Sequence, residues 1–171
     1  MDRYMKYAIV YSSRTGNTKM LADTIEKVLP KDSIIYCGPA DDKALQADRI
    51  YIGFWTNQGV CDDETKAFLG KLTNQEVFLF GTAGFGGSST YFDKFFHRTR
   101  SLLPKDVKFV ASYMCQGKMP MSVRERYVKM QQLPNPPIPN LDKMIKNFDA
   151  ALEHPSKDDL RNFSNWLKEM V

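Results

Sequence analysis

A run of hydroxyl side chains around a single glycine, Ser12-Ser13-Arg14-Thr15-Gly16-Asn17-Thr18, follows the apolar segment 7–11. An amphipathic stretch begins directly after it, so the run is expected to join a buried strand to the first turn of a helix. Free backbone N–H groups and the positive end of the helix dipole would then face one spot, an arrangement that binds a phosphate group. The same residue types also cap helices and form turns, so a plain helix cap is the alternative.

Two further loops have unusual compositions for strand-to-helix connections. Segment 54–59 places an aromatic pair before amide side chains, and segment 81–91 has four glycines around Phe85. A flat heteroaromatic ligand with a phosphate tail, such as flavin mononucleotide (FMN), would use the hydroxyls for its phosphate, Trp55 for stacking and the glycines for close approach of the backbone. Taken singly, Trp55 is more simply a core aromatic and the glycines a tight turn. Three such loops together favour the ligand.

Short apolar runs alternate with amphipathic stretches along the first two thirds of the chain. The expected strands are 7–11, 33–36, 49–54, 77–80 and 107–113, and the expected helices between them are 17–28, 63–72 and 91–103. Continuous apolar strands indicate burial on both faces, and the connection 37–48 has room only for a short helical crossover. We therefore predict a doubly wound α/β fold with a five-stranded parallel sheet in the order 2-1-3-4-5 and helices on both faces.

The C-terminal third is expected to be helical. A helix is predicted over 122–132, the proline-rich run 134–139 ends it, and Ser156 with Asp159 predicts a capping box before the last helix. We expect one domain spanning 1–171, with 116–171 as a helical extension packed on the same core.

Composition excludes several classes of function. The net charge of +4 comes from basic residues scattered among acids, which does not favour nucleic-acid binding. No apolar run approaches the roughly 20 residues of a membrane span and no signal-peptide pattern is present, so we expect a cytoplasmic protein. Three cysteines without paired spacing are expected to be reduced thiols, and two isolated histidines predict no metal site.

The segment 13–18 resembles the phosphate loop of the flavodoxin family, which reads roughly Ser/Thr-x-Thr-Gly-Asn-Ser/Thr. The resemblance covers about residues 6–115 and is poor from Gln116 onward. Within the family the chain is similar to a less typical bacterial branch, as segments 53–55 and 115–120 indicate. Two departures stand out: flavodoxins are usually strongly acidic, and the loop after the fourth strand has Phe85 and no Asp-x-x-x-Tyr signature.

The resemblance implies that FMN is the cofactor, with its phosphate in the first loop and its ring between the other two. The residues that the resemblance assigns to FMN are Ser12, Ser13, Arg14, Thr15, Gly16, Asn17 and Thr18 for the phosphate, and Phe54, Trp55, Thr56, Asn57, Gln58, Gly59, Thr82, Ala83, Gly84, Phe85 and Gly86 for the ring.

We therefore predict a monomeric FMN-binding electron-transfer protein that takes electrons from a separate reductase and passes them to an acceptor enzyme, without catalytic residues of its own. The alternative is a small FMN-dependent oxidoreductase acting directly on a quinone or tetrapyrrole-like substrate, with 115–126 as a pocket wall. Lys118, Arg124 and Arg126 would then bind substrate carboxylates, although the solvated face of a helix explains them more simply. A receiver domain is excluded because Gly53-Phe54 stands where its acceptor aspartate is required.

Overall fold

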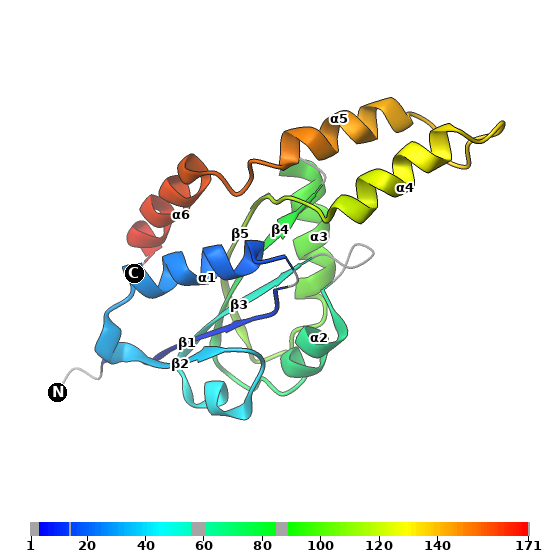
Figure 1. Ribbon diagram of the computed structural model, residues 1–171. Helices are drawn as coiled ribbons and strands as arrows, with labels where there is room; N and C mark the ends of the chain where they lie inside the picture. The colour runs from blue at the N-terminus through cyan, green and yellow to red at the C-terminus, as the bar shows by residue number, and fades with distance from the viewer. Residues whose placement is uncertain (1–3, 14, 56–60, 85–88, 171) are drawn as a thin grey trace.

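The computed structural model describes residues 4–13, 15–55, 61–84 and 89–170 and shows a parallel sheet between two layers of helices (Figure 1). The five strands are β1 Tyr7–Tyr11, β2 Ile34–Gly38, β3 Arg49–Trp55, β4 Glu76–Ala83 and β5 Lys108–Gln116. They pair in the order β2-β1-β3-β4-β5, and every pair is parallel. The predicted fold class and strand order are confirmed.

The helices follow the strands in the expected alternation. They are α1 Asn17–Val28, α2 Asp63–Leu69, α3 Ser89–Arg100, α4 Met121–Gln131, α5 Leu141–Ala151 and α6 Lys157–Met170. The predicted bounds of the first helix are confirmed, and the short crossover before β3 is the 3-10 turn Asp42–Gln46. In the part of the chain that the structure describes, no helix has the length and apolar character needed to cross a membrane.

The sheet is buried on both faces, which is why its strands are continuous apolar runs. In β1, Ala8 and Val10 face a hydrophobic layer shared with α2 and α3, whereas Tyr7 and Ile9 face a second layer shared with α1 and α6. Side chains that alternate along a strand thus enter two separate cores. This packing holds the carboxyl ends of β1, β3 and β4 at one edge of the sheet.

Strand β4 is longer than the sequence predicted. It continues beyond Phe80 through Gly81 and Thr82 to Ala83, because Gly81 allows its backbone to approach the neighbouring strand. A Cβ atom on Gly81 would lie 2.7 Å from the carbonyl oxygen of Phe54. Glycine here is a requirement of strand packing and not the start of a loop.

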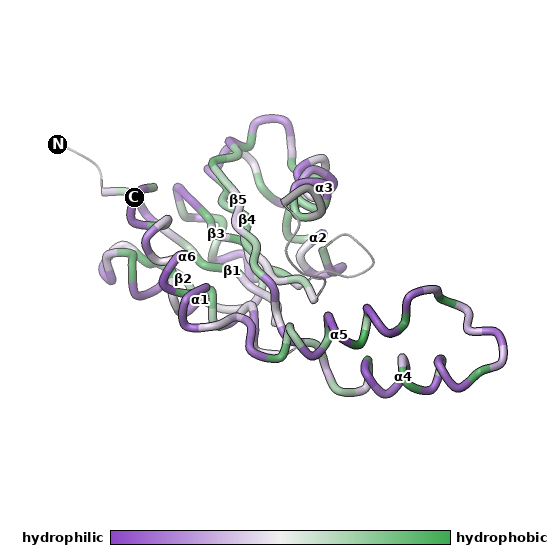
Figure 2. The backbone as a smooth tube through the Cα atoms, turned by 90° about the horizontal axis from the view of Figure 1, so that it is seen from above, coloured by the Kyte–Doolittle hydropathy of each residue, from purple (hydrophilic) through white to green (hydrophobic). Residues whose placement is uncertain are grey.

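The C-terminal segment has two parts that pack differently. Helix α6 lies along α1, and its side chains Phe163 and Leu167 are fully buried in the sheet layer on that side. The predicted capping box at its start is confirmed: Ser156 Oγ accepts from Asp159 N (3.1 Å), and Asp159 Oδ2 accepts from Ser156 N (2.7 Å). Helices α4 and α5 pack against each other and reach away from the sheet in two perpendicular views (Figures 1 and 2).

Candidate functional site

Two hollows lie at the carboxyl edge of the sheet, where the order of the strands reverses, and both are bordered by Trp55 at the end of β3. The first, here called the phosphate-loop hollow, has a volume of about 580 Å³ and is lined by Tyr11, Ser12, Ser13, Gly16, Lys19, Pro39, Trp55, Asp62 and Glu64. The second, here called the α4 cavity, has a volume of about 250 Å³ and is lined by Thr15, Asn17, Trp55, Thr82, Gly84, Gly117, Lys118, Met119, Pro120, Ser122, Val123 and Arg126. The described residues at the ends of the three predicted loops therefore border these two hollows.

The loop after β1 directs backbone amides toward one oxygen atom. Gly16 adopts a left-handed conformation with φ of +89°, which turns the chain into α1 at Asn17. The N–H groups of Gly16 and Lys19 both donate to Ser13 Oγ, at 3.1 and 3.4 Å. The start of α1 thus presents amide donors to an oxygen, as a phosphate cradle must.

Ser12 has a different role from its neighbour. Its hydroxyl donates to Asp62 Oδ1 at 2.7 Å, and the same carboxylate caps α2 by accepting from the N–H (3.2 Å) and the hydroxyl (2.7 Å) of Thr65. These three donors satisfy a carboxylate that is only 8% exposed. The bonds of Ser12 therefore hold the loop to α2 and leave Ser13 as the serine whose oxygen faces the amides.

Asn17, the first residue of α1, is buried and only half satisfied. Its Nδ2 donates to the backbone oxygen of Lys118 at 2.8 Å, which fixes the orientation of the amide, and its Oδ1 has no hydrogen-bond partner in the described residues. The side chain lines the α4 cavity and is 5% exposed. A buried acceptor without a partner is costly unless a ligand or water donates to it. Thr18, the next residue, points into the core instead and is 1% exposed.

The side chains predicted to hold a ring divide between the cavity and the core. Trp55, Thr82 and Gly84 line the α4 cavity. Phe54 is fully buried, and the centroid of its ring lies 5.4 Å from that of Phe95 and 6.3 Å from that of Phe96. Its side chain therefore packs in the core. Ala83, the last residue of β4, also packs in the core, and its carbonyl oxygen accepts a hydrogen bond from Gly117 N at 3.0 Å.

Several of the predicted ligand residues lie outside the described part of the chain. They are Arg14, Thr56, Asn57, Gln58, Gly59, Phe85 and Gly86. Their assignment to the phosphate and the ring stays a prediction.

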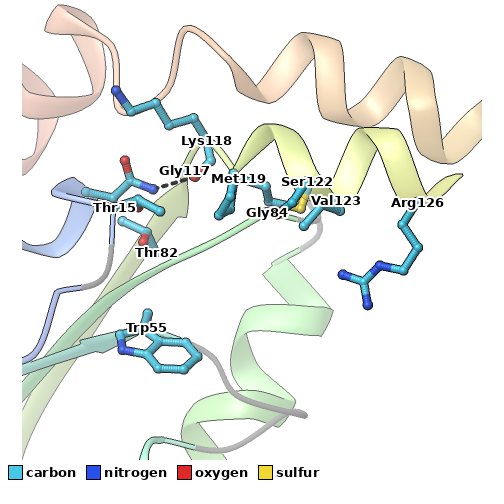
Figure 3. Close-up of a pocket in the computed structure, with 12 residues that line it drawn as sticks. Thr15, Trp55, Thr82, Gly84, Gly117, Lys118, Met119, Ser122, Val123 and Arg126 are labelled. Atoms are coloured by element: carbon cyan, nitrogen blue, oxygen red, sulfur yellow. Dashed lines mark hydrogen bonds between the residues drawn. The ribbon is translucent and has the colours of Figure 1, made fainter. Parts of the chain in front are cut away.

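The wall opposite Trp55 comes from the segment between β5 and α4 (Figure 3). The three basic residues considered from the sequence take different positions. The side chain of Lys118 points away from the cavity. Arg124 forms a bidentate ion pair with Asp149 of α5, with N···O distances of 2.9 and 3.2 Å. Arg126 lines the cavity, and its guanidinium points to the side of α4 on which Trp55 lies.

Hydrogen bonds and close packing that were not predicted from the sequence join the base of the α4–α5 pair to the site. Asn147 of α5 donates to the carbonyl oxygen of Gly84 at 3.0 Å, and Gln116 donates to the same oxygen at 3.2 Å. Gly117 fits closely, since a Cβ atom there would lie 2.6 Å from Asn17 Nδ2 and 2.9 Å from Thr82 Cβ. These residues come from distant segments, so no local pattern identifies them.

Reactive protein groups are few at this edge. Burial, followed by the charge of Asp159, raises the pKa of the Cys115 thiol to about 12, so the thiolate is negligible at neutral pH. All three cysteines are free thiols. Among the described residues no group of three or more His, Cys, Asp or Glu side chains could hold a metal ion.

The described residues fit FMN. The amides that converge at the start of α1 and the hydroxyl of Ser13 suit a phosphate in the phosphate-loop hollow, which Lys19, paired with Asp23, also borders. The hydroxyl of Thr15 borders the adjoining α4 cavity. The unpartnered Asn17 Oδ1 suits a hydroxyl donor such as the ribityl chain. Trp55 borders both hollows and offers a flat face between them. These groups suit the phosphate, the hydroxyl chain and the ring of FMN.

Comparison with known proteins identifies the family. The sequence matches the flavodoxin domain over residues 8–168. It is 41% identical over 184 aligned residues to the flavodoxin-like domain-containing protein BilS of Clostridium symbiosum (strain WAL-14163), an alignment that covers 98% of this chain and 96% of that protein.

Solved structures show the same fold. A flavodoxin from the domain Archaea superposes with a TM-score of 0.52 at 14% identity, covering 97% of this chain and 96% of its own. A flavoprotein in complex with FMN from Lactobacillus acidophilus NCFM gives a TM-score of 0.51 at 16% identity, covering 66% of this chain and 94% of its own. Because the family match spans nearly the whole chain, the protein belongs to the flavodoxin domain family.

Proposed function

We propose that the protein is an electron carrier that uses FMN to pass electrons from a separate reductase to an acceptor enzyme. FMN is the cofactor, as membership of the flavodoxin family implies, and the described residues fit it. When bound, FMN supplies the redox chemistry, because it accepts and releases electrons singly or in pairs. The protein supplies binding, orientation and electrostatics.

The phosphate would lie at the start of α1. Ser13, Thr15 and the first N–H groups of the helix would hold it, and the N–H groups that now bond to Ser13 Oγ would turn to a phosphate oxygen. The amide N–H groups and the helix dipole stabilise negative charge there. Asp62 is close by, but its carboxylate accepts three hydrogen bonds from Ser12 and Thr65, which reduces its repulsion of a phosphate.

The ring would lie against Trp55, and the polar groups of Asn17 and Thr82 would face the rest of the ligand. Trp55 would orient the ring by stacking and shield one face from water. An Asn17 Oδ1 acceptor would bind a hydroxyl of the chain that joins ring to phosphate. Met119 and Val123 of the opposite wall would exclude water from the other side of the cavity.

The small volume of the α4 cavity is the observation that favours an electron carrier over a direct oxidoreductase. Its volume of about 250 Å³ is below the 300–1,000 Å³ of a usual organic-ligand site. Once a flavin ring enters, little space is left for a second organic substrate. The electrons would then leave through the exposed edge of the site to a docked protein. We place this exchange in the cytoplasm, in keeping with the three free thiols.

One observation favours the second candidate, a direct oxidoreductase for a quinone or tetrapyrrole-like substrate. Arg126 lines the cavity and has no ion-pair partner in the residues that the structure describes, so it is available to a substrate carboxylate or carbonyl. The cavity would have to widen for such a substrate, which requires that Met119 and Val123 on the wall opposite Trp55 move.

Anaerobic reduction of the FMN-loaded protein distinguishes the two candidates. Dithionite should reduce a carrier in two resolved one-electron steps, seen by absorbance, and the reduced protein should pass single electrons to a haem protein. An enzyme should take up two electrons in one step and reduce menadione with saturable kinetics. Saturable quinone reduction together with a single reductive step would overturn the carrier proposal.

A further inference from the structure

The segment 117–152, here called the α4–α5 hairpin, is a structural unit that does not cover the sheet. Its two helices contact each other and are joined by the Arg124–Asp149 ion pair, and each has a buried aromatic side chain, Tyr127 in α4 and Phe148 in α5. No described residue of the hairpin belongs to either hydrophobic layer of the sheet. It extends beyond the body of the molecule in both views (Figures 1 and 2). Its role therefore lies outside the packing of the sheet.

The positive charge of the protein is concentrated in this hairpin. Of 24 basic residues in the chain it has six, against three of the 20 acidic residues, so it accounts for three of the four net positive charges. Within it, Arg124 is paired with Asp149. The exposed cations that remain without an ion pair in the described residues are Lys118, Arg126, Lys129, Lys143 and Lys146. The rest of the chain is close to neutral.

The base of the hairpin is a wall of the proposed FMN site. Met119 and Val123 line the α4 cavity, and Asn147 of α5 is bonded to the loop after β4 through Gly84. A protein that docked against the hairpin so as to reach its base would therefore lie beside the ring. Electron transfer between proteins depends on such closeness, and charge complementarity both orients the encounter and raises its rate.

We propose that the α4–α5 hairpin is a docking arm for an acidic surface of a redox partner protein. This inference rests on the proposed function as an electron carrier. The charge of the hairpin indicates the kind of partner, because five exposed cations outnumber the two acids Glu125 and Asp142. A partner surface rich in carboxylates is therefore attracted to the hairpin, and a basic surface is repelled. The lysines give rate and orientation, and Met121 and Leu133, which are 56% and 51% exposed, add apolar contact.

The test compares two variants with the same change in net charge. The hairpin variant carries Lys129→Glu, Lys143→Glu and Lys146→Glu, none of which lines either hollow. The control variant reverses three exposed lysines that precede strands, at the opposite edge of the sheet, and these are Lys31→Glu, Lys43→Glu and Lys105→Glu. FMN titration verifies that each variant is folded and loaded. The probes are two haem proteins of opposite charge, the acidic cytochrome b5 and the basic cytochrome c.

Stopped-flow mixing at low ionic strength measures the second-order rate of cytochrome reduction by the FMN-loaded, reduced protein. We expect the hairpin variant to reduce cytochrome b5 at least about tenfold more slowly than the wild type, within the 10–10³ range of electrostatic steering. For the control variant, the decrease in the logarithm of this rate should be less than about a third of the decrease in the hairpin variant. With the basic cytochrome c, the hairpin variant should instead react faster than the wild type. In 0.5 M salt, the differences in rate between the proteins should disappear.

If both variants lose the same factor in the rate of cytochrome b5 reduction, the net charge of the protein alone determines the rate, and the docking-arm proposal is overturned. The same conclusion follows if DNA or vesicles of anionic lipid bind the hairpin more tightly than cytochrome b5 does at equal ionic strength. Binding of oxidised cytochrome b5, followed by NMR shifts of hairpin amides, needs no electron transfer. Failure of the carrier function would leave those shifts in place while no cytochrome is reduced, so the two failures are distinguishable.

Discussion

Replacing Gly117, a residue that the sequence did not assign to the cofactor, by alanine should weaken FMN binding. The new Cβ atom would lie 2.6 Å from Asn17 Nδ2 and 2.9 Å from Thr82 Cβ, closer than such atoms pack. Asn17 Nδ2 is bonded to the neighbouring carbonyl of Lys118 at 2.8 Å, so the bond and the position of Asn17 must change together. The substitution therefore displaces the first residue of α1.

The magnitude follows from overpacking and one hydrogen bond. Inserting a methyl group into a filled site typically costs about 1–3 kcal/mol. Loss of the Asn17 bond adds about 1 kcal/mol if the amide cannot find another acceptor. We expect the free energy of unfolding of the cofactor-free protein to fall by about 1–4 kcal/mol, the upper end applying if the hydrogen bond is lost. If the strain is relieved by moving Asn17, FMN affinity should fall by about one to two factors of ten, since 1.4 kcal/mol is tenfold.

Urea unfolding and FMN fluorescence titration measure the two effects separately. The matched control is Gly70→Ala at the end of α2, where a Cβ atom would meet only the Ala67 carbonyl oxygen at 3.5 Å and the backbone is right-handed helical. That change should alter stability by less than about 1 kcal/mol and leave FMN binding unchanged. A Gly117→Ala protein that unfolds and binds FMN like the wild type would refute the coupling between the base of the hairpin and α1.

Three further predictions concern separate parts of the molecule. Trp55→Ala should lower FMN affinity by about 1–3 kcal/mol, the range for stacking of a base on an aromatic side chain, and change cofactor-free stability less; titration with unchanged affinity would remove Trp55 from the ring site. Burial raises the pKa of Asp159, but the hydrogen bonds with His154 and Ser156 together outweigh it and lower the pKa overall, so this carboxylate stabilises the fold above about pH 4. The difference in unfolding free energy between wild type and Asp159→Asn should therefore be present at pH 7 and shrink as the pH falls below about 4, and a difference independent of pH would contradict this account. Burial raises the pKa of both the Cys115 thiol (to about 12) and the Cys37 thiol (to about 11), so exposure decides which one reacts. Iodoacetamide at pH 8 should modify the exposed Cys37 first and leave the buried Cys115 unmodified in the folded protein, as mass spectrometry of digests would report.

The fold could be predicted because its signals are local and repeated. The run 7–11 followed by the turn at Gly16 is a strand that leads into a helix, and the structure places α1 where the pattern predicted it. The apolar strands and the short crossover at Asp42–Gln46 left few alternatives to the order β2-β1-β3-β4-β5. At Gly81 the local signal was wrong, because a glycine that usually indicates a loop is needed there for contact between strands.

The site could be predicted only as far as its loops. The amides around Ser13 and the position of Trp55 follow from residue type and from the edge of the sheet on which parallel strands end. The second wall comes from 117–126, whose place depends on contacts between residues about a hundred positions apart, such as Asn17 with Lys118. The direction in which α4 and α5 leave the body also depends on those contacts, and no helix-period pattern encodes it.

Titration of the purified chain with FMN, and in parallel with riboflavin, tests the central claim most directly. The two ligands share the ring and ribityl chain and differ in the phosphate, so their difference in affinity isolates the cradle at the start of α1. The account predicts saturable binding of one FMN per chain, with riboflavin weaker by at least about tenfold, or about 1.4 kcal/mol. Equal affinities for the two ligands, or no saturable binding of FMN, would contradict it.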